Sequence, residues 1–477
     1  MAFWQWTALT AAAAALPYAG DRDALPSCAA LDDVAAELSR LPNVFGARRA
    51  ELRELASPPL PGYRSQCFVH SPTNLPATDE AFSWRQPTVS RGAFAKDEVV
   101  GCLPAVLVIG AHKTGTTDMF HRLAQHPLAH AQSALKESNF FCFPGQSPWG
   151  GWVDYARKHV NQASSAVQEH WVRGGAARSL LRDGGGRRRL KDHFLPFEER
   201  VRQAPHIFGI DATPANTYCR VGGSGIAHVP FFARAVLGPR ARVVAMTRDP
   251  VDRAYSDYKY FAAFQRPRGA ALGQVACPYR SPPGARRASL RFEVSADHFA
   301  RVASWAVDEL DRCFDHGWRS AHCARLACHD LRAPPFAACP PGRVLLGLYD
   351  AFLGDWEAAF DRPDCGHRGL LRVAVEDVNR DPAAALRRVA SFLELDVSDA
   401  SVFAAMASPN RTRPQDAQDA ARHLPISDPG PVHPTTRALL EDFYARRASA
   451  KLPRALNCSS PHPTRGRWVD PPGDHTR

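Results

Sequence analysis

The sequence contains fewer acidic than basic side chains, and it shows no internal repeat. Its 477 residues include 59 Lys and Arg against 48 Asp and Glu, which gives a formal net charge of +11. The missing repeat excludes an architecture of stacked repeats. The shortage of carboxylates favours an anionic partner, which could be nucleic acid, a membrane surface or an acidic polysaccharide. On charge alone, a basic composition without any partner remains the alternative.

A mostly apolar stretch lies at the N-terminus, but it lacks the basic residues that begin a typical signal peptide. It runs from Ala2 to Ala19 and ends in small residues before Asp21. A membrane span needs about 20 apolar residues, so the length is borderline, while the small residues suit a cleavage site. We therefore interpret residues 1–19 as a secretory signal peptide or a signal anchor.

The composition divides the remaining chain into three parts. Residues 20–100 are rich in Pro, Ala and Arg with little periodicity, which is typical of a stem. The alternating strand and helix patterns begin at 101, and we assign the main domain to residues 101–457. Within it, residues 173–193 carry a run of Arg and Lys and are expected to form an exposed insertion, which is either solvated or grips an acidic polymer. The polar, Pro-rich tail, residues 458–477, is predicted to be disordered.

Twelve cysteines indicate an oxidising lumen, although their spacing does not define the pairing. Several of them fall in a stretch that also contains histidines, which leaves zinc as an alternative: Cys313, His316, His322, Cys323, Cys328, His329 and Cys339. Because these spacings match no two-plus-two ligand pattern, disulfides are favoured over metal. Two sequons, at Asn410 and Asn457, permit glycosylation in a secretory compartment.

Short apolar runs followed by helix-like segments predict an α/β fold. Four runs read as buried strands: Val106–Ile109, 206–211, 242–247 and 370–375. Asp381 precedes Pro382 as a helix N-cap, and the apolar period that follows extends to Leu393. Strands alternating with helices predict a parallel sheet that helices cover on both faces.

The turn after the first of these strands is a candidate phosphate cradle. It reads Gly110-Ala-His-Lys113-Thr-Gly115-Thr-Thr and leads into a helix. Backbone amides at the start of that helix and the charge of Lys113 would attract an anion. In a nucleotide-hydrolysing P-loop the lysine follows the second glycine, whereas Lys113 precedes Gly115 by two residues. A glycine-rich turn without a ligand is the alternative, so a second site is needed to decide.

That second site follows the strand at 242–247. Arg248 ends the strand and Ser256 lies eight residues further on, within the next predicted helix. A guanidinium and a hydroxyl can hold a second phosphate together. Taken alone, Arg248 could equally pair with Asp252 on the helix surface. Two anion sites in this order favour a ligand with two separated phosphate groups.

The two motifs resemble the donor sites of the Golgi carbohydrate sulfotransferases that use 3′-phosphoadenosine 5′-phosphosulfate (PAPS). Three further segments are similar to the same family: Lys136 to Phe141, Gly347 to Trp356, and Asn410 to Asp416. The last of these, with the sequence around Arg248, resembles most the members that sulfate O6 of N-acetylgalactosamine 4-sulfate. The resemblance covers about residues 101–455 and implies the P-loop-like sulfotransferase fold.

The resemblance also implies a role for each matching residue. Lys113 would contact the sulfuryl group and Glu137 would take the proton of the acceptor hydroxyl, so these two would be catalytic. The 5′-phosphate would lie on the cradle, and Arg248 and Ser256 would hold the 3′-phosphate. The donor-binding residues would be Lys113, Thr114, Gly115, Thr116, Thr117, Arg248, Ser256, Arg411, Thr412 and Arg413. Acceptor contacts are expected from Lys136, Asn139 and Asp211, and no metal is expected. Without the resemblance, Glu137 reads as a surface carboxylate paired with Lys136.

The expected acceptor is an acidic polysaccharide rather than nucleic acid. Asn139 stands where the family has His, and Ala212 stands where the heparan enzymes carry Lys. These differences make a heparan acceptor less favoured than a galactosaminoglycan or an unrelated sulfated polysaccharide. We expect a sulfated galactosaminoglycan, with a heparan-like or an algal polysaccharide as the alternative. A P-loop kinase and a polyanion-binding protein without turnover are the alternatives from other classes. The resemblance implies a Golgi location, with residues 2–19 as a membrane anchor, or secretion.

Overall fold

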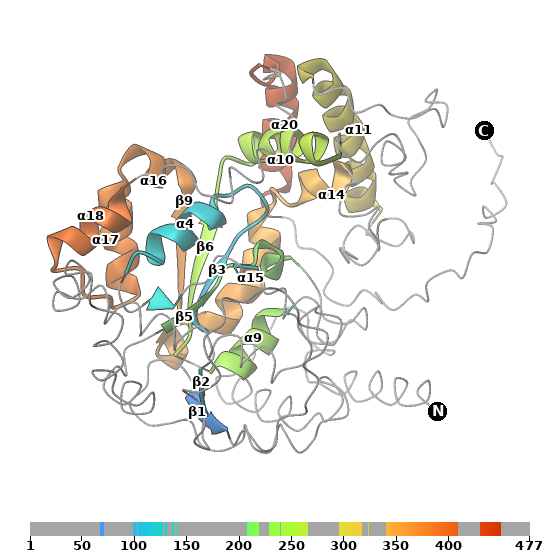
Figure 1. Ribbon diagram of the computed structural model, residues 1–477. Helices are drawn as coiled ribbons and strands as arrows, with labels where there is room; N and C mark the ends of the chain where they lie inside the picture. Colours follow the sequence, from blue (N-terminus) through green and yellow to red (C-terminus); the bar gives the residue numbers. More distant parts are fainter. Residues whose placement is uncertain are drawn as a thin grey trace, which may run out of the picture.

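A parallel sheet forms the centre of the computed structural model (Figure 1). The structure describes Phe141, Cys323 and the following ranges: 67–70, 99–102, 104–126, 129–130, 136–137, 208–218, 229–238, 240–265, 295–316, 340–408 and 430–449. The sheet has five strands in the order β4-β5-β3-β6-β9, and every neighbouring pair is parallel. Their bounds are Ala129–His130 for β4, Phe208–Asp211 for β5, Pro104–Ile109 for β3, Arg242–Thr247 for β6 and Leu370–Ala374 for β9.

The four predicted strands are confirmed, with small shifts at their ends. The bounds of β6 agree with the prediction, β5 begins two residues later than expected, and β9 ends one residue earlier. In the pairing of the two central strands, Ile109 of β3 lies beside Ala245 of β6. Because both strands run the same way, their carboxyl ends meet at one edge of the sheet. The turns that follow β3 and β6 are therefore neighbours.

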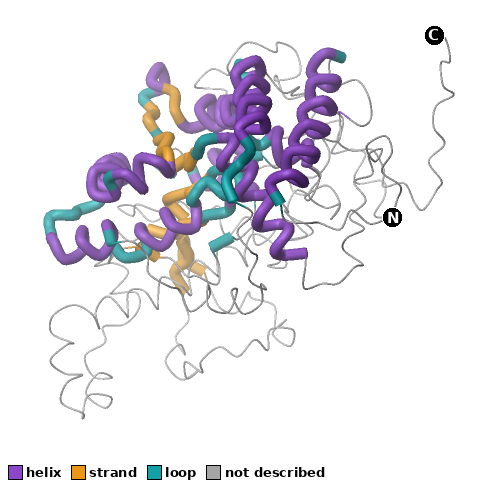
Figure 2. The backbone as a smooth tube through the Cα atoms, turned by 90° about the horizontal axis from the view of Figure 1, so that it is seen from above, coloured by secondary structure: helices purple, strands orange, loops and turns teal. Residues whose placement is uncertain are grey.

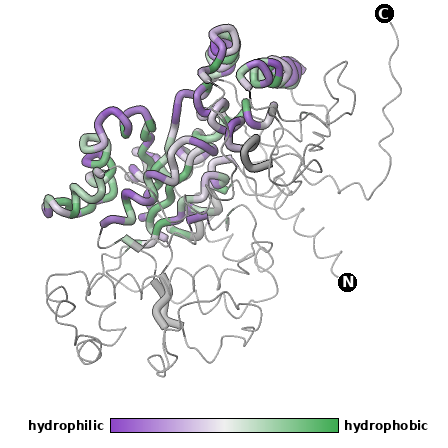
Figure 3. Tube along the Cα trace, turned by 45° about the horizontal axis from the view of Figure 1, so that its top comes forward, coloured by the Kyte–Doolittle hydropathy of each residue, from purple (hydrophilic) through white to green (hydrophobic). Residues whose placement is uncertain are grey.

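Helices cover both faces of the sheet, as the continuous apolar runs predict. Side chains along a strand alternate between the two faces, so Leu107 and Ile109 enter one core and Val106 and Val108 enter the other. The first core includes α9 (Val229–Leu237) and α15 (Tyr349–Phe360). The second includes α4 (Thr116–Leu123), α17 (Pro382–Phe392) and α18 (Ala400–Ala407). Figure 3 shows hydrophobic segments running through the middle of this arrangement.

A second group of helices gathers beyond the carboxyl edge of the sheet. It contains α10 (Pro250–Gln265), α11 (Ala296–Asp315), α14 (Pro340–Leu345) and α20 (Pro434–Arg447), which Figures 1 and 2 show from two directions. Ion pairs join α20 to α11, with Arg447 Nη2 at 2.8 Å from Asp311 Oδ1. Since α10 begins directly after β6, this group frames the edge where the predicted anion sites lie.

The predicted helix start at Asp381 is confirmed. The Asp381 carboxylate accepts a hydrogen bond from the amide of Ala384 at 2.9 Å, and Pro382 is the first residue of α17. A side-chain cap of this kind satisfies one of the amides that a helix start leaves unpaired. Just before it, α16 (Val375–Arg380) connects β9 to α17. Smaller elements are η7 (Pro214–Thr217), η10 (Pro363–Cys365) and the antiparallel pair of β7 (Asp361–Arg362) and β8 (His367–Arg368).

The stretch interpreted as a stem contains most of one antiparallel strand pair. Its strands are β1 (Cys67–His70) and β2 (Val99–Cys102), which pair over four residues each. The candidate signal or anchor at 1–19, the insertion at 173–193 and the tail at 458–477 lie outside the described residues. Among the helices that the structure describes, none combines the length and the apolar character needed to cross a membrane.

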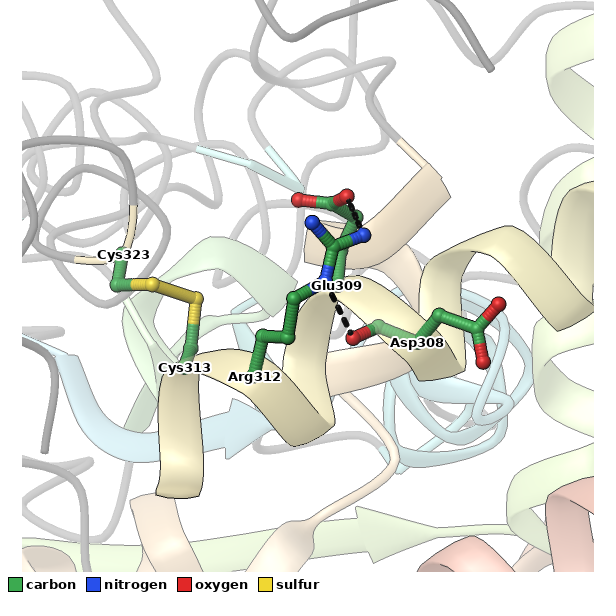
Figure 4. Close-up of a disulfide and its surroundings, with 5 residues drawn as sticks. All are labelled: Asp308, Glu309, Arg312, Cys313 and Cys323. Carbon is green, nitrogen blue, oxygen red and sulfur yellow. Dashed lines mark hydrogen bonds and ion pairs between the residues drawn. A yellow bond between two sulfur atoms is a disulfide. The ribbon is translucent and has the colours of Figure 1, made fainter. Parts of the chain in front are cut away.

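A disulfide joins Cys313, near the end of α11, to Cys323 (Figure 4). Both residues belong to the stretch for which zinc was the alternative, and neither sulfur is available as a thiolate ligand once the bond has formed. The bond accords with the oxidising compartment that the cysteine content indicates. Asp308, Glu309 and Arg312 lie on α11 beside it, with Arg312 Nε donating to the carbonyl of Asp308 at 3.3 Å.

Removing this disulfide is expected to destabilise the domain. For a loop with a sequence separation of 10, the loss of chain constraint in the unfolded state corresponds to about 2–3 kcal/mol. Urea unfolding of the double variant Cys313→Ser/Cys323→Ser should therefore show a lower free energy of unfolding than the unreduced native chain. Equal unfolding midpoints for the two proteins would contradict this expectation.

Candidate functional site

The turn after β3 has the backbone of an anion cradle. Gly110 and Gly115 adopt φ values of 149° and 88°, and Lys113 between them has a φ of 71°. Residues that carry a side chain rarely adopt such φ values. A Cβ on Gly110 would also lie 2.5 Å from the carbonyl oxygen of Met246. The hydroxyl of Thr114 donates to the carbonyl of Ala111 at 2.8 Å and closes the turn. The amides in the first turn of α4 then point toward the concave side of the loop.

The cradle is held by η7, the short helix that follows the neighbouring strand β5. The amide of Gly110 donates to the hydroxyl of Thr217 in η7 at 2.6 Å. That short helix is positioned in turn by Asp211, whose carboxylate accepts hydrogen bonds from the amide and the hydroxyl of Thr213, at 3.1 and 2.7 Å. Asp211 is fully buried, so the contacts described for it are internal. Its expected role in acceptor binding stays a prediction.

Arg248 connects the second predicted anion site to the first. It follows β6 directly, and its Nη1 donates to the carbonyl of Lys113 at 3.3 Å. The hydroxyl of Tyr349 at the start of α15 donates to the carbonyl of Arg248 at 2.8 Å. Burial raises the pKa of Tyr349, so the hydroxyl keeps its proton and remains a donor. The structure therefore gives the tyrosine of the Gly347-Leu-Tyr349 segment a role in fixing the backbone of Arg248.

The alternative pairing of Arg248 with Asp252 is not what the structure contains. Asp252 forms an ion pair with Arg437 of α20 instead. The same Arg437 lies 3.6 Å from Asp249, whose amide donates to Glu376 at 2.8 Å. Both carboxylates of this turn thus face Arg437 of α20, while Arg248 donates to the cradle.

Ser256 lies in α10, on a partly exposed part of the helix. Residues four apart share a helix face, so Tyr260 lies one turn further along the same face. The ring of Tyr260 packs over Lys113, with the ammonium nitrogen 4.4 Å from the ring centroid. The face of α10 that carries Ser256 and Tyr260 is therefore turned toward the cradle.

Glu137 lies beside its expected partner at the same edge of the sheet. The carbonyl of Lys136 accepts from the amide of Ala212 at 2.9 Å, which extends the strand pairing past β5. Lys136 Nζ lies 2.5 Å from Glu137 Oε1, and the Glu137 side chain is 43% exposed. The pairing that the residues alone suggest is thus present. The charges of Glu137 and Lys136 both act on His112 in the cradle, so the pair is also close to the turn.

A buried charge cluster underlies the cradle, and sequence reasoning missed most of it. Asp257 and Arg253, one turn apart in α10, are fully buried and pair at 3.2 Å. Arg343 from α14 lies 3.1 Å from the same carboxylate. The spacing of Arg253 and Asp257 is a readable helix pair, but nothing in the sequence links Arg343 to them. Together they place one carboxylate between two guanidinium groups near the loop.

Two cradle residues have shifted pKa values. Burial is the main cause that lowers the pKa of Lys113; Asp257 acts against this, while Arg248 and Lys136 lower the value further. Burial also lowers the pKa of His112 from 6.5 to about 4, with the charge of Arg343 as the next cause. The imidazole is therefore neutral at physiological pH. Its ring lies 5.8 Å from that of Tyr218, centroid to centroid.

Arg122 connects the end of the cradle helix α4 to the end of α18. Arg122 Nε lies 2.6 Å from Asp118 Oδ2, and Arg122 Nη1 donates to the carbonyl of Ala407 at 2.9 Å. These bonds tie the cradle helix to the end of α18. The predicted nucleotide-binding residues Arg411, Thr412 and Arg413 lie outside the described residues, as does the acceptor candidate Asn139.

The partly buried, neutral His112 predicts a pH-dependent stability. In the unfolded chain its pKa is 6.5 and in the folded chain about 4, so the unfolded state binds more protons between these values. The stability that His112 contributes is therefore present above pH 6.5 and lost as the pH falls toward 4. Urea unfolding of native protein and His112→Asn across this window should show a smaller fall in stability for the variant. Parallel pH profiles would contradict the assignment.

The chain is similar to known sulfotransferases. Residues 104–303 match the model of the sulfotransferase family. The chain is 25% identical over 386 residues to human carbohydrate sulfotransferase 15, and the match covers 74% of this chain and 54% of the relative. For the rat protein of the same name the identity is 24% over 373 residues, covering 72% and 52%. The chain thus spans about half the length of the known relatives it matches.

A solved structure of a sulfotransferase superposes only loosely on this chain. It is a sulfotransferase from Alicyclobacillus acidocaldarius, at 18% identity and a TM-score of 0.34, covering 73% of this chain and 95% of that one. A superposition this loose supports no argument about the site. The family match instead rests on the sequence, and it spans the cradle, Glu137, Arg248 and Ser256. Within residues 104–303, this chain therefore matches the sulfotransferase family.

Proposed function

We propose that this chain transfers a sulfuryl group from PAPS to a hydroxyl of an acidic polysaccharide. The observation that carries the proposal is the hydrogen bond of 3.3 Å from Arg248 Nη1 to the carbonyl of Lys113. It brings a phosphate-binding turn and a second cation to one edge of the sheet. A nucleotide that carries phosphate groups at both its 3′ and its 5′ positions requires such an arrangement. The position of Lys113 ahead of Gly115 argues against a P-loop kinase.

The donor would be held along this edge. The amides of Gly115, Thr116 and Thr117 would bind the 5′-phosphate, since a helix start attracts anions, and Thr114 would shape the turn through its hydrogen bond to the carbonyl of Ala111. Arg248 and Ser256 would bind the 3′-phosphate. Arg411, Thr412 and Arg413 would close over the nucleotide. These residues supply the positive charge that the donor needs without a metal ion.

The transfer itself would be an in-line displacement at sulfur. Glu137 would accept the proton of the acceptor hydroxyl while the new bond from that oxygen to sulfur forms. The bond from sulfur to the 5′-phosphate oxygen breaks, and adenosine 3′,5′-bisphosphate leaves. Lys113 would stabilise the negative charge that develops on the bridging oxygen, as cations do in phosphoryl transfer.

The finer assignment of the acceptor rests on the relatives and on the motifs. The relatives are named carbohydrate sulfotransferase 15, and the loop from Asn410 resembles members that act on O6 of N-acetylgalactosamine 4-sulfate. We propose a sulfated galactosaminoglycan as acceptor, contacted by Lys136, Asn139 and Asp211. Such a polymer is made in the Golgi lumen, so we place the chain there, anchored through residues 2–19 or released by cleavage.

Nucleotide binding distinguishes this function from that of a kinase. In calorimetric titrations the native chain should bind adenosine 3′,5′-bisphosphate at least about tenfold more tightly than ATP, because only the first has a 3′-phosphate for Arg248. Lys113→Ala should weaken binding of PAPS and abolish most transfer. Equal affinities for the two nucleotides would refute the proposal, and full activity of Lys113→Ala would contradict the role of the cradle.

Transfer of radiolabelled sulfate tests the base and the acceptor. With PAPS and a panel of chondroitin, dermatan, heparan and algal polysaccharides, the native chain should label chondroitin 4-sulfate at O6. Glu137→Gln should lower kcat by about 10²- to 10⁴-fold and keep nucleotide affinity, since it removes only a proton acceptor.

Glu394→Gln is the matched control for this experiment. Glu394 is an exposed glutamate that pairs with Arg242 at 2.9 Å, at the opposite end of β6 from the cradle. Its substitution should leave transfer unchanged. A Glu137→Gln variant as active as this control would exclude Glu137 as the base.

A further inference from the structure

Tyr260 is an exposed aromatic residue at the candidate site that the donor-binding residues do not account for. It is 41% exposed, although the large apolar side chains around it on α10, such as Tyr255 and Tyr258, are buried. Its ring lies over the ammonium group of Lys113, 4.4 Å from nitrogen to centroid. An aromatic ring that stays in solvent while contacting a functional lysine is well placed to meet a second ligand.

The distance to Lys113 locates the ring relative to the reacting group. A sulfuryl oxygen that hydrogen bonds to Lys113 Nζ would lie ~2.9 Å from that nitrogen. With 4.4 Å from the nitrogen to the ring centroid, the ring lies within about 7 Å of the sulfuryl oxygen. Because Lys113 lies over one face of the ring, a sugar would stack on the other face, which places it beside the cradle.

The chemistry of the ring favours a sugar. The face of an aromatic ring carries partial negative charge, which attracts the weakly positive C–H groups on the apolar face of a pyranose. Stacking also removes apolar area from water. The contact with Lys113 shows that the ring already attracts positive groups, as cation–π geometry requires. The hydroxyl, sulfate and carboxylate groups of an acidic polysaccharide would project from the rim of the same sugar toward Lys113 and Lys136.

We propose that Tyr260 is an acceptor-binding residue, whose ring stacks, on the face away from Lys113, on a pyranose unit of the polysaccharide beside the cradle. This inference rests on the proposed function and adds a residue and a contact to it. Ser256, one turn earlier on the same face of α10, would bind the donor, so one helix would position both substrates. The helix is fixed on an adjoining face by α14, whose Arg343 lies 3.1 Å from the buried carboxylate of Asp257.

Two variants separate the ring from the hydroxyl. Tyr260→Phe keeps the ring, and Tyr260→Leu removes it from a position that is exposed enough to tolerate the change. A chondroitin 4-sulfate tetrasaccharide is titrated calorimetrically into each protein with saturating adenosine 3′,5′-bisphosphate, so no turnover is needed. We expect Tyr260→Phe to bind within about twofold of the native chain and Tyr260→Leu about tenfold more weakly. The affinity for the nucleotide should stay within about twofold in both, which also confirms that they fold.

The outcomes distinguish this inference from the proposed function. If Tyr260→Leu binds the tetrasaccharide as the native chain does, or if neither protein binds it, the inference is wrong. If Tyr260→Leu instead loses affinity for the nucleotide, the ring serves the donor, through the adenine or through Lys113, and the inference is also wrong. A native chain that binds the tetrasaccharide through Tyr260 but transfers no sulfate from PAPS to any polysaccharide would keep the sugar contact and overturn the proposed function.

Discussion

The parallel pairing of β3 with β6 is the constraint on which the rest of the site depends. It aligns the two central strands, with Ile109 beside Ala245, so the turns that follow them emerge together. One turn supplies Lys113 and the other supplies Arg248, which then meet through a single hydrogen bond. If the strands were antiparallel, the two turns would lie at opposite edges of the sheet. The parallel pairing therefore brings together two predicted anion-binding motifs that are far apart in the sequence.

Collecting cations at this edge has an electrostatic cost, and the fold offsets it locally. Lys113, Arg248, Arg253 and Arg343 all lie near the cradle, while Asp257 is buried between two of the guanidinium groups. A buried charge without a partner is far more costly than a paired one. The carboxylate thus stabilises Arg253 and Arg343 and acts on Lys113 as well. Lys113 and Arg248 stay partly exposed, so their positive charge can be reached by a phosphate or sulfate group.

Sequence reasoning succeeded where the determining interactions are local. The strands at 242–247 and 106–109 follow from short apolar runs, and the cap at Asp381 follows from two adjacent residues. It failed where the partner is distant in the chain. Arg343 is 86 residues from Asp257, and the hydroxyl of Tyr349 meets the carbonyl of Arg248 across 101 residues. Asp252 was a plausible partner for Arg248 because the two residues are four apart in the sequence, whereas the actual partner of Asp252, Arg437, is distant in the chain.

The sequence by itself determined the elements and the chemistry of the cradle. Glycines at 110 and 115 and the lysine between them define a turn that can bind an anion, whatever surrounds it. The tertiary structure alone decided how these parts face one another. It turned Arg248 toward Lys113, buried Asp211 under η7, and laid the ring of Tyr260 over the lysine. The reason is physical: backbone conformation and periodicity are encoded in neighbouring residues, whereas side-chain orientation depends on packing between helices and strands that meet only after folding.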